Sequence, residues 1–222
     1  MEIKICGITN LKDAICVCKS GADAIGFIFY RKSPRYISPE TARDIIKNLP
    51  QDLCKVGVFV NHDPRDVKDI FSLCGLTMIQ LHGDESPEYC RQFATDTLIK
   101  AISSRTQKDL CGLPDFPVRA ILWDASEPGY YGGTGKTSNW DLAAMVKKTH
   151  NLILAGGLNV SNINDAIMTV SPHAVDVNSG VEISPGRKDP VKIHSIIEMI
   201  RTITRNSPGQ VFSKKKDSEH QA

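Results

Sequence analysis

Residues 77–87 read Thr77-Met78-Ile79-Gln80-Leu81-His82-Gly83-Asp84-Glu85-Ser86-Pro87, a short apolar run followed by a polar turn and then a serine and a proline. The apolar run has the length and composition of a buried strand. A serine at a helix start accepts a backbone N–H that has no other partner, and a proline at the first helical position loses no hydrogen bond. This stretch therefore predicts a strand followed directly by a helix.

The same strand-and-helix unit recurs along the chain. Similar helix starts occur at Ser38-Pro39, Asp63-Pro64 and Asp189-Pro190. The apolar, β-branched runs that predict strands are 2–6, 22–29, 55–60, 77–81, 97–102, 119–124, 152–155 and 174–177. Strict alternation of buried strands with helices requires parallel pairing, and eight such units favour closure into a barrel. An open, doubly wound sheet is the alternative, because the number of strands does not by itself establish closure.

The last helix supports this layered arrangement. Ile193, Ile196, Ile197 and Ile200 have the spacing of one buried stripe, which predicts a helix packed on the outside of the sheet. A chain of 222 residues can bury one sizeable core. We therefore expect a single compact α/β domain, a (βα)8 barrel, over residues 1–203. The polar segment 204–222 offers little apolar material and is expected to be disordered.

Composition argues against several classes of partner. The formal net charge is only +2, so the chain lacks the strong field that attracts nucleic acid or an anionic membrane surface. The seven cysteines are odd in number and form no CxxC pair, which is typical of reduced thiols in a cytoplasmic protein. No apolar stretch is long enough to span a membrane. We expect a cytoplasmic protein without nucleic-acid or membrane partners.

In a barrel of this kind the active site lies where strands end, so polar residues at those positions become candidates. Cys6 ends the first strand and should face the barrel mouth; a catalytic role requires the thiolate, and hence a nearby cation or helix N-terminus. Asp124 ends the sixth strand, and strand alternation turns it inward while Trp123 points outward. Partial burial would let Asp124 donate a proton near neutral pH. The alternatives are a structural cysteine and a turn-forming aspartate.

Two late loops predict a phosphate site. Gly156 and Gly157 follow the seventh strand, and Ser179 and Gly180 follow the eighth, the two positions at which many barrels bind phosphate. Two ordinary turns are the alternative. Gly135-Lys136-Thr137 is not a P-loop, because the first required glycine falls at Tyr130. Residues 129–137 are better interpreted as a mobile loop that covers a ligand.

Two further side chains are candidates for substrate binding. Arg35 follows the second strand and could hold a substrate carboxylate through two hydrogen bonds, although a surface arginine explains it nearly as well. His82 ends the fourth strand, where it lines the site or bonds to backbone.

The chain resembles the phosphoribosylanthranilate isomerase family of tryptophan biosynthesis. Each segment alone is weakly specific, but their occurrence in the family's order is highly specific. The segments are Lys4-Ile5-Cys6-Gly7-Ile8-Thr9, Gly26-Phe27-Ile28-Phe29, Lys32-Ser33-Pro34-Arg35, Gln80-Leu81-His82-Gly83, Gly132-Gly133-Thr134-Gly135, Leu154-Ala155-Gly156-Gly157-Leu158 and Asp176-Val177-Asn178-Ser179-Gly180-Val181-Glu182.

The resemblance implies a monomeric barrel that carries out an Amadori rearrangement of a small phosphoribosyl substrate without cofactor or metal. It assigns ring opening to Asp124 as general acid and removal of the C2 proton to Cys6 as general base. It also assigns the substrate carboxylate to Arg35 and the phosphate to the turns at Gly157 and Ser179-Gly180. The alternatives are the histidine-pathway Amadori isomerase, which has an aspartate at the position of Cys6, and a phosphosugar sensor without catalysis. Indole-glycerol-phosphate synthase is a further barrel relative, but its catalytic lysine and glutamate are not evident.

Overall fold

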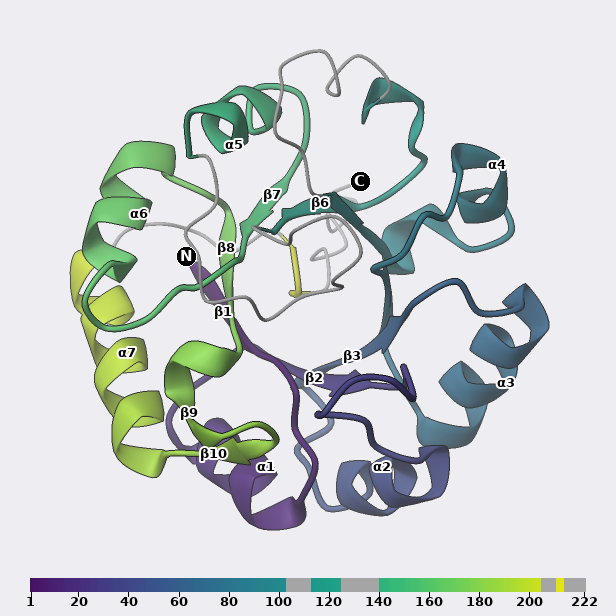
Figure 1. Cartoon of the computed structure of the whole chain (residues 1–222), viewed down its shortest axis with the longest axis horizontal. Helices are drawn as coiled ribbons and strands as arrows, with labels where there is room; N and C mark the ends of the chain where they lie inside the picture. Colours follow the sequence, from purple (N-terminus) through teal and green to yellow (C-terminus); the bar gives the residue numbers. More distant parts are fainter. Residues whose placement is uncertain (103–112, 125–139, 205–210, 214–222) are drawn as a thin grey trace, which may run out of the picture.

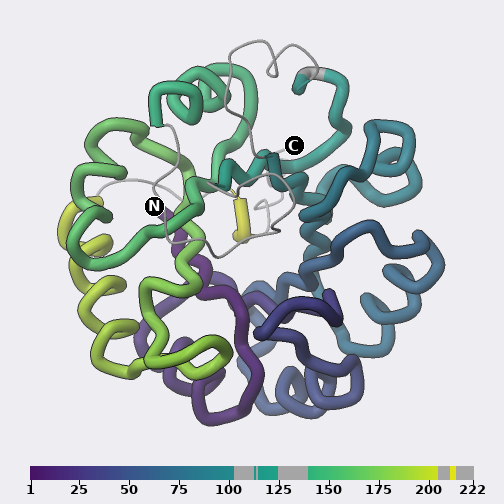
Figure 2. The backbone as a smooth tube through the Cα atoms, in the orientation of Figure 1, coloured from purple at the N-terminus to yellow at the C-terminus, as the bar shows by residue number. Residues whose placement is uncertain are grey.

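Eight parallel strands form a closed barrel in the computed structural model, which describes residues 1–102, 113–124, 140–204 and 211–213. The strands follow one another around the ring in chain order, as the colour sequence of the tube in Figure 2 shows. They are β1 (Glu2–Ile5), β2 (Ala24–Ile28), β3 (Cys54–Phe59), β4 (Met78–Leu81), β5 (Leu98–Ile102), β6 (Ala120–Trp123), β7 (Leu152–Leu154) and β8 (Ala174–Val177). Because β1 pairs with β8, the open-sheet alternative is excluded and the predicted barrel is confirmed.

The helices lie outside the ring of strands, as Figure 1 shows. They are α1 (Leu11–Lys19), α2 (Pro39–Ile46), α3 (Pro64–Cys74), α4 (Pro87–Cys90), α5 (Trp140–Val146), α6 (Ile163–Val170) and α7 (Pro190–Ile203). Short 3-10 turns occur at η1 (Thr95–Thr97), η3 (Leu113–Asp115) and η4 (Ser179–Val181), and β9 (Glu182–Ser184) pairs with β10 (Arg187–Lys188). In these parts of the chain no helix has both the length and the apolar character needed to cross a membrane.

The four predicted helix starts are confirmed. In each case a serine or aspartate side chain accepts a backbone N–H from the first turn, and proline occupies the start of the helix. Ile193, Ile196, Ile197 and Ile200 of α7 are buried, which confirms the predicted stripe. These caps accept backbone N–H groups of the first turn that have no partner within the helix, and they fix the residue at which each helix begins.

The core has two parts, which follow from the alternation of side chains along each strand. Ile3 and Ile5 belong to the outer cluster, together with the isoleucines of α7. The interior of the barrel is filled mainly by smaller residues such as Ala24, Val56 and Ala120. On β1 the intervening residues Glu2 and Lys4 are buried charged groups, and Lys4 faces the buried Asp176 of the neighbouring strand β8.

Part of the C-terminal segment is buried, which the sequence analysis did not anticipate. Val211 and Phe212 join the cluster inside the barrel. The Glu2 carboxylate accepts the backbone N–H groups of Val211, Phe212 and Ser213 at 2.6, 2.9 and 2.8 Å. Arg119 donates to the carbonyl groups of Val211 and Ser213. For residues 211–213 the expectation of disorder is wrong, because the buried Glu2 carboxylate at the start of β1 accepts hydrogen bonds from their backbone N–H groups.

We predict that deleting residues 205–222 lowers the free energy of unfolding by about 2–4 kcal/mol, since it exposes apolar surface and leaves Glu2 buried without its donors. Deleting only 214–222 is the matched control, because it keeps the residues that Glu2 and Arg119 bind, and should change stability by less than about 0.5 kcal/mol. Urea unfolding followed by circular dichroism measures both. Equal stability of the two truncated proteins would show that the buried contact contributes nothing.

Candidate active site

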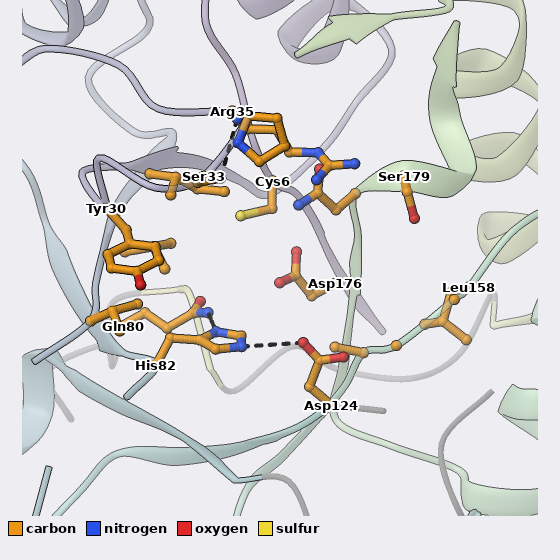
Figure 3. A pocket seen from close by; sticks show the side chains of 18 of the residues that line it. Cys6, Tyr30, Ser33, Arg35, Gln80, His82, Asp124, Leu158, Asp176 and Ser179 are labelled. Carbon is orange, nitrogen blue, oxygen red and sulfur yellow. Dashed lines mark hydrogen bonds and ion pairs between the residues drawn. The ribbon is translucent and has the colours of Figure 1, made fainter. Parts of the chain in front are cut away.

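A cavity of about 330 Å³ opens at the carboxyl ends of the barrel strands. Figure 3 shows Cys6 and Asp124 on opposite sides of this cavity, with Asp176 between them in this view. Most of the predicted site residues line it: Cys6, Arg35, His82, Asp124, Gly156, Gly157 and Ser179. Gly180 is not among the lining residues. Its Cα packs against the Leu158 carbonyl so closely that a side chain there would collide with it.

Cys6 directly follows β1, and its backbone N–H donates to Val177 at the end of β8 at 2.9 Å. Gly7 then turns the chain with a φ of +75°, and a side chain at this position would collide with Asn178 and Arg35. Burial raises the pKa of the Cys6 thiol above its ordinary value, while the Lys4 ammonium group acts to lower it. Lys4, two residues earlier in the chain, is thus a cation beside the Cys6 thiol.

Lys4 and Asp176 were not among the predicted site residues. The Lys4 Nζ donates to the Asp176 Oδ2 at 2.7 Å, and both groups are buried. Asp176 lines the cavity, and its Oδ1 has no hydrogen-bond partner among the described residues. A signal for Lys4 was present in the sequence, because strand alternation places residues 4 and 6 on the same inward face.

Asp124 follows β6 and is held by a histidine, while Trp123 is buried in the outer cluster as predicted. The Asp124 Oδ2 lies 3.2 Å from the His82 Nε2, and the His82 Nδ1 lies 2.8 Å from the Gln80 Nε2. If the Gln80 amide donates to Nδ1, then Nε2 carries the proton and donates to Asp124. His82 thus contacts the carboxylate directly, and one carboxylate oxygen stays available to face the cavity.

Arg35 lies at the cavity, but one edge of its guanidinium group is already occupied. Its Nε and Nη2 donate to the Glu182 carboxylate at 2.9 and 2.7 Å. Lys188 also donates to Glu182, at 3.0 Å, and the two cations outweigh burial, so the pKa of Glu182 is lowered. A ligand carboxylate bound by Arg35 would have to use the edge that carries Nη1. Sequence reasoning missed Glu182, because nothing local links it to Arg35.

The two glycine-bearing turns adjoin one another beside the cavity. Gly156 and Gly157 have φ values of +90° and +65°, which residues with side chains rarely adopt. The side-chain amides of Asn159 and Asn162 both donate to the Gly157 carbonyl at 3.0 Å. These bonds hold the Gly157 carbonyl in place within the turn after β7. The predicted covering loop at 129–137, with its glycine segment, lies outside the residues that the structure describes.

A family model and curated relatives match most of this chain. The family model described as N-(5'phosphoribosyl)anthranilate (PRA) isomerase matches residues 3–199. The N-(5'-phosphoribosyl)anthranilate isomerase of Syntrophus aciditrophicus is 52% identical over 200 residues, which cover 90% of this chain and 87% of that protein.

Solved structures agree with this result. The phosphoribosyl anthranilate isomerase of Thermotoga maritima is 44% identical with a TM-score of 0.83, and the match covers 92% of this chain and 99% of that one. A phosphoribosyl anthranilate isomerase solved in complex with reduced 1-(o-carboxyphenylamino)-1-deoxyribulose 5-phosphate is 43% identical, with a TM-score of 0.79 and coverage of 89% and 97%. From its sequence, its fold and these relatives, the chain belongs to the N-(5'-phosphoribosyl)anthranilate isomerase family.

Proposed function

We propose that this chain converts N-(5'-phosphoribosyl)anthranilate to 1-(2-carboxyphenylamino)-1-deoxyribulose 5-phosphate in tryptophan biosynthesis, with Asp124 as general acid and Cys6 as general base. Family membership supports the reaction, which is an Amadori rearrangement. The observation that supports the two roles is that a thiol and a carboxyl group from strands far apart in sequence line opposite sides of one cavity. A donor and an acceptor are what the two proton transfers require.

Asp124 begins the proposed reaction. Its carboxyl group gives a proton to the furanose ring oxygen, the bond between that oxygen and C1 breaks, and the nitrogen lone pair forms a Schiff base. The His82 contact at 3.2 Å holds one carboxylate oxygen, so that the other is directed toward the sugar. Positioning of this kind limits the geometries that the acid samples before proton transfer.

Cys6 then removes the proton from C2 on the other side of the sugar. The resulting enolamine tautomerises to the ketose. The raised pKa of Cys6 makes its thiolate a stronger base than an ordinary cysteine, although the thiolate is the minor form at neutral pH. Activity limited by this group should rise as pH approaches the pKa of the thiol from below.

Binding is assigned to the rest of the cavity. Backbone at Gly156, Gly157 and Ser179, which line the cavity, and at the adjoining Gly180 is proposed to hold the phosphate, because glycine turns let backbone N–H groups approach an anion closely. Arg35 is proposed to bind the anthranilate carboxylate through its Nη1 edge. His82, beside Asp124, is placed to contact the sugar as well.

We also infer that the enzyme acts as a monomer in the cytoplasm. The monomeric state is what the family resemblance implies. The six cysteines within the described residues are free thiols, as expected in a reducing compartment. The histidine-pathway isomerase and a non-catalytic sensor are not favoured, because the family model and the similar proteins are phosphoribosylanthranilate isomerases. Turnover assays with each substrate test this choice.

Replacing Cys6 by serine should lower kcat for loss of phosphoribosylanthranilate fluorescence by about 10²–10⁴-fold, because a hydroxyl is a much poorer base than a thiolate. Product binding, measured by calorimetry, should be largely unchanged. Cys16→Ser, on α1 away from the cavity, is the control and should retain full activity. Wild-type turnover by Cys6→Ser would remove this residue from the mechanism.

Replacing Asp124 by asparagine should cause a loss of similar size, about 10²–10⁴-fold in kcat, since the amide keeps the shape of the carboxyl group but cannot supply the proton. The exposed Asp141 on α5 provides the matched control, Asp141→Asn, with steady-state kinetics as the measurement. The assignment fails if both aspartate variants turn over at the wild-type rate.

A further inference from the structure

Beneath the cavity lies a buried lysine that the proposed chemistry does not use. The Lys4 side chain is fully buried within the barrel, and its ammonium group donates to Asp176 on β8 at 2.7 Å. A buried ammonium group is costly unless it is paired, and Asp176 supplies that partner here. The Asp176 Oδ1 has no hydrogen-bond partner in the described part of the chain, although it is buried and its residue lines the cavity.

Lys4 and Cys6 are close neighbours across a glycine. Both side chains point into the barrel, Lys4 from β1 and Cys6 from the position that follows this strand. Gly26 on the neighbouring strand β2 lies beside them. The point at which Gly26 would carry a Cβ lies 2.7 Å from the Cys6 Sγ and 3.1 Å from the Lys4 Cε. Any other residue at position 26 would push these groups apart. The absence of a side chain at Gly26 thus leaves room for the Cys6 thiol and the Lys4 side chain to lie next to each other.

The charges beside Cys6 act in opposite directions. Burial raises the pKa of the thiol most, the positive charge of Lys4 is the largest influence that lowers it, and the negative charge of Asp176 raises it. Lys4 itself remains a cation, because Asp176 and Cys6 together outweigh its burial and raise its pKa. The titratable or charged groups facing Cys6 from the surrounding elements, besides this pair, are Lys188 from β10, Arg35 after β2, and His82 and Asp124 across the cavity.

We propose that Lys4 is a positioning residue for the isomerase: its ammonium group, anchored by Asp176, is the counter-ion that stabilises the Cys6 thiolate beside C2 of the substrate. Lys4 keeps its protons throughout. The thiolate takes the C2 proton and becomes the neutral thiol, while the electron pair of the C–H bond moves into the enolamine. This inference rests on the proposed role of Cys6 and adds the group on which formation of the thiolate depends.

The test measures the ionisation of Cys6 directly. Wild-type enzyme and variants are alkylated with iodoacetamide across a pH series, and the rate at Cys6 is followed by mass spectrometry of its peptide. The pH profile of kcat/KM is measured alongside. Lys4→Met should move both the alkylation midpoint and the acid limb of kcat/KM to higher pH by about one unit or more. Lys4→Arg keeps the charge and should move them much less.

Substitution of Asp176, which anchors Lys4, should shift the alkylation midpoint of Cys6 in the opposite direction. Asp176→Asn removes a negative charge beside the thiol and should move the Cys6 midpoint to lower pH. If single variants do not fold because one buried charge is left alone, the double variant Lys4→Met/Asp176→Asn removes both, which buried pairs often tolerate. Its midpoint should still lie above that of wild type, because Lys4 influences the thiol more than Asp176 does.

Lys55→Met is the matched control, since Lys55 is a buried lysine on β3 that binds the carbonyl groups of Pro50 and Gln51. It should leave the Cys6 midpoint unchanged. A purely structural role for Lys4 would reduce stability or the plateau of kcat/KM without moving the midpoint. An unmoved midpoint in Lys4→Met, or one at or below wild type in the double variant, would overturn the inference. Full turnover by Cys6→Ser would instead refute the proposed role of Cys6.

Discussion

The barrel closes at a seam that holds a buried ion pair. Lys4 on β1 and Asp176 on β8 are register partners, so their side chains meet inside the barrel at the junction of the first and last strands. Buried charges of this kind are not a general source of stability, but removing one partner of such a pair costs about 3–5 kcal/mol. The pair therefore favours one register at closure over others in which a charge would be left alone. Cys6 and the turn after β8 are positioned by that same register.

Strand β1 links the two ends of the barrel through its inward side chains. Glu2 binds the backbone of residues 211–213, Lys4 pairs with Asp176, and Cys6 reaches the cavity. Ile3 and Ile5, which alternate with them, pack in the outer cluster with the helices. A shift of β1 by one residue would exchange these two sets of side chains. The position of the proposed base is thus fixed by the packing of an entire strand.

The sequence predicted the features that depend on local chemistry. Apolar runs indicated the strands, proline and capping residues indicated helix starts, and the ends of strands indicated Cys6 and Asp124. The missing features are contacts between residues distant in sequence. The Lys4 contact with Asp176 depends on the β1–β8 register. The two hydrogen bonds from Arg35 to the Glu182 carboxylate depend on a hairpin after β8. The burial of Val211 was missed because the surrounding segment is polar and its partner is the buried carboxylate of Glu2.

The central claim is that the Cys6 thiol and the Asp124 carboxyl group exchange protons with one sugar from opposite sides, while the glycine turns bind its phosphate. A crystal structure of this enzyme with the reduced product analogue tests it most directly. We expect the Cys6 sulfur next to C2, the Asp124 carboxylate on the other side of the sugar chain, and the phosphate at Gly157 and Ser179. A ligand bound with its phosphate elsewhere, or with Cys6 and Asp124 on the same side of C2, would contradict the account.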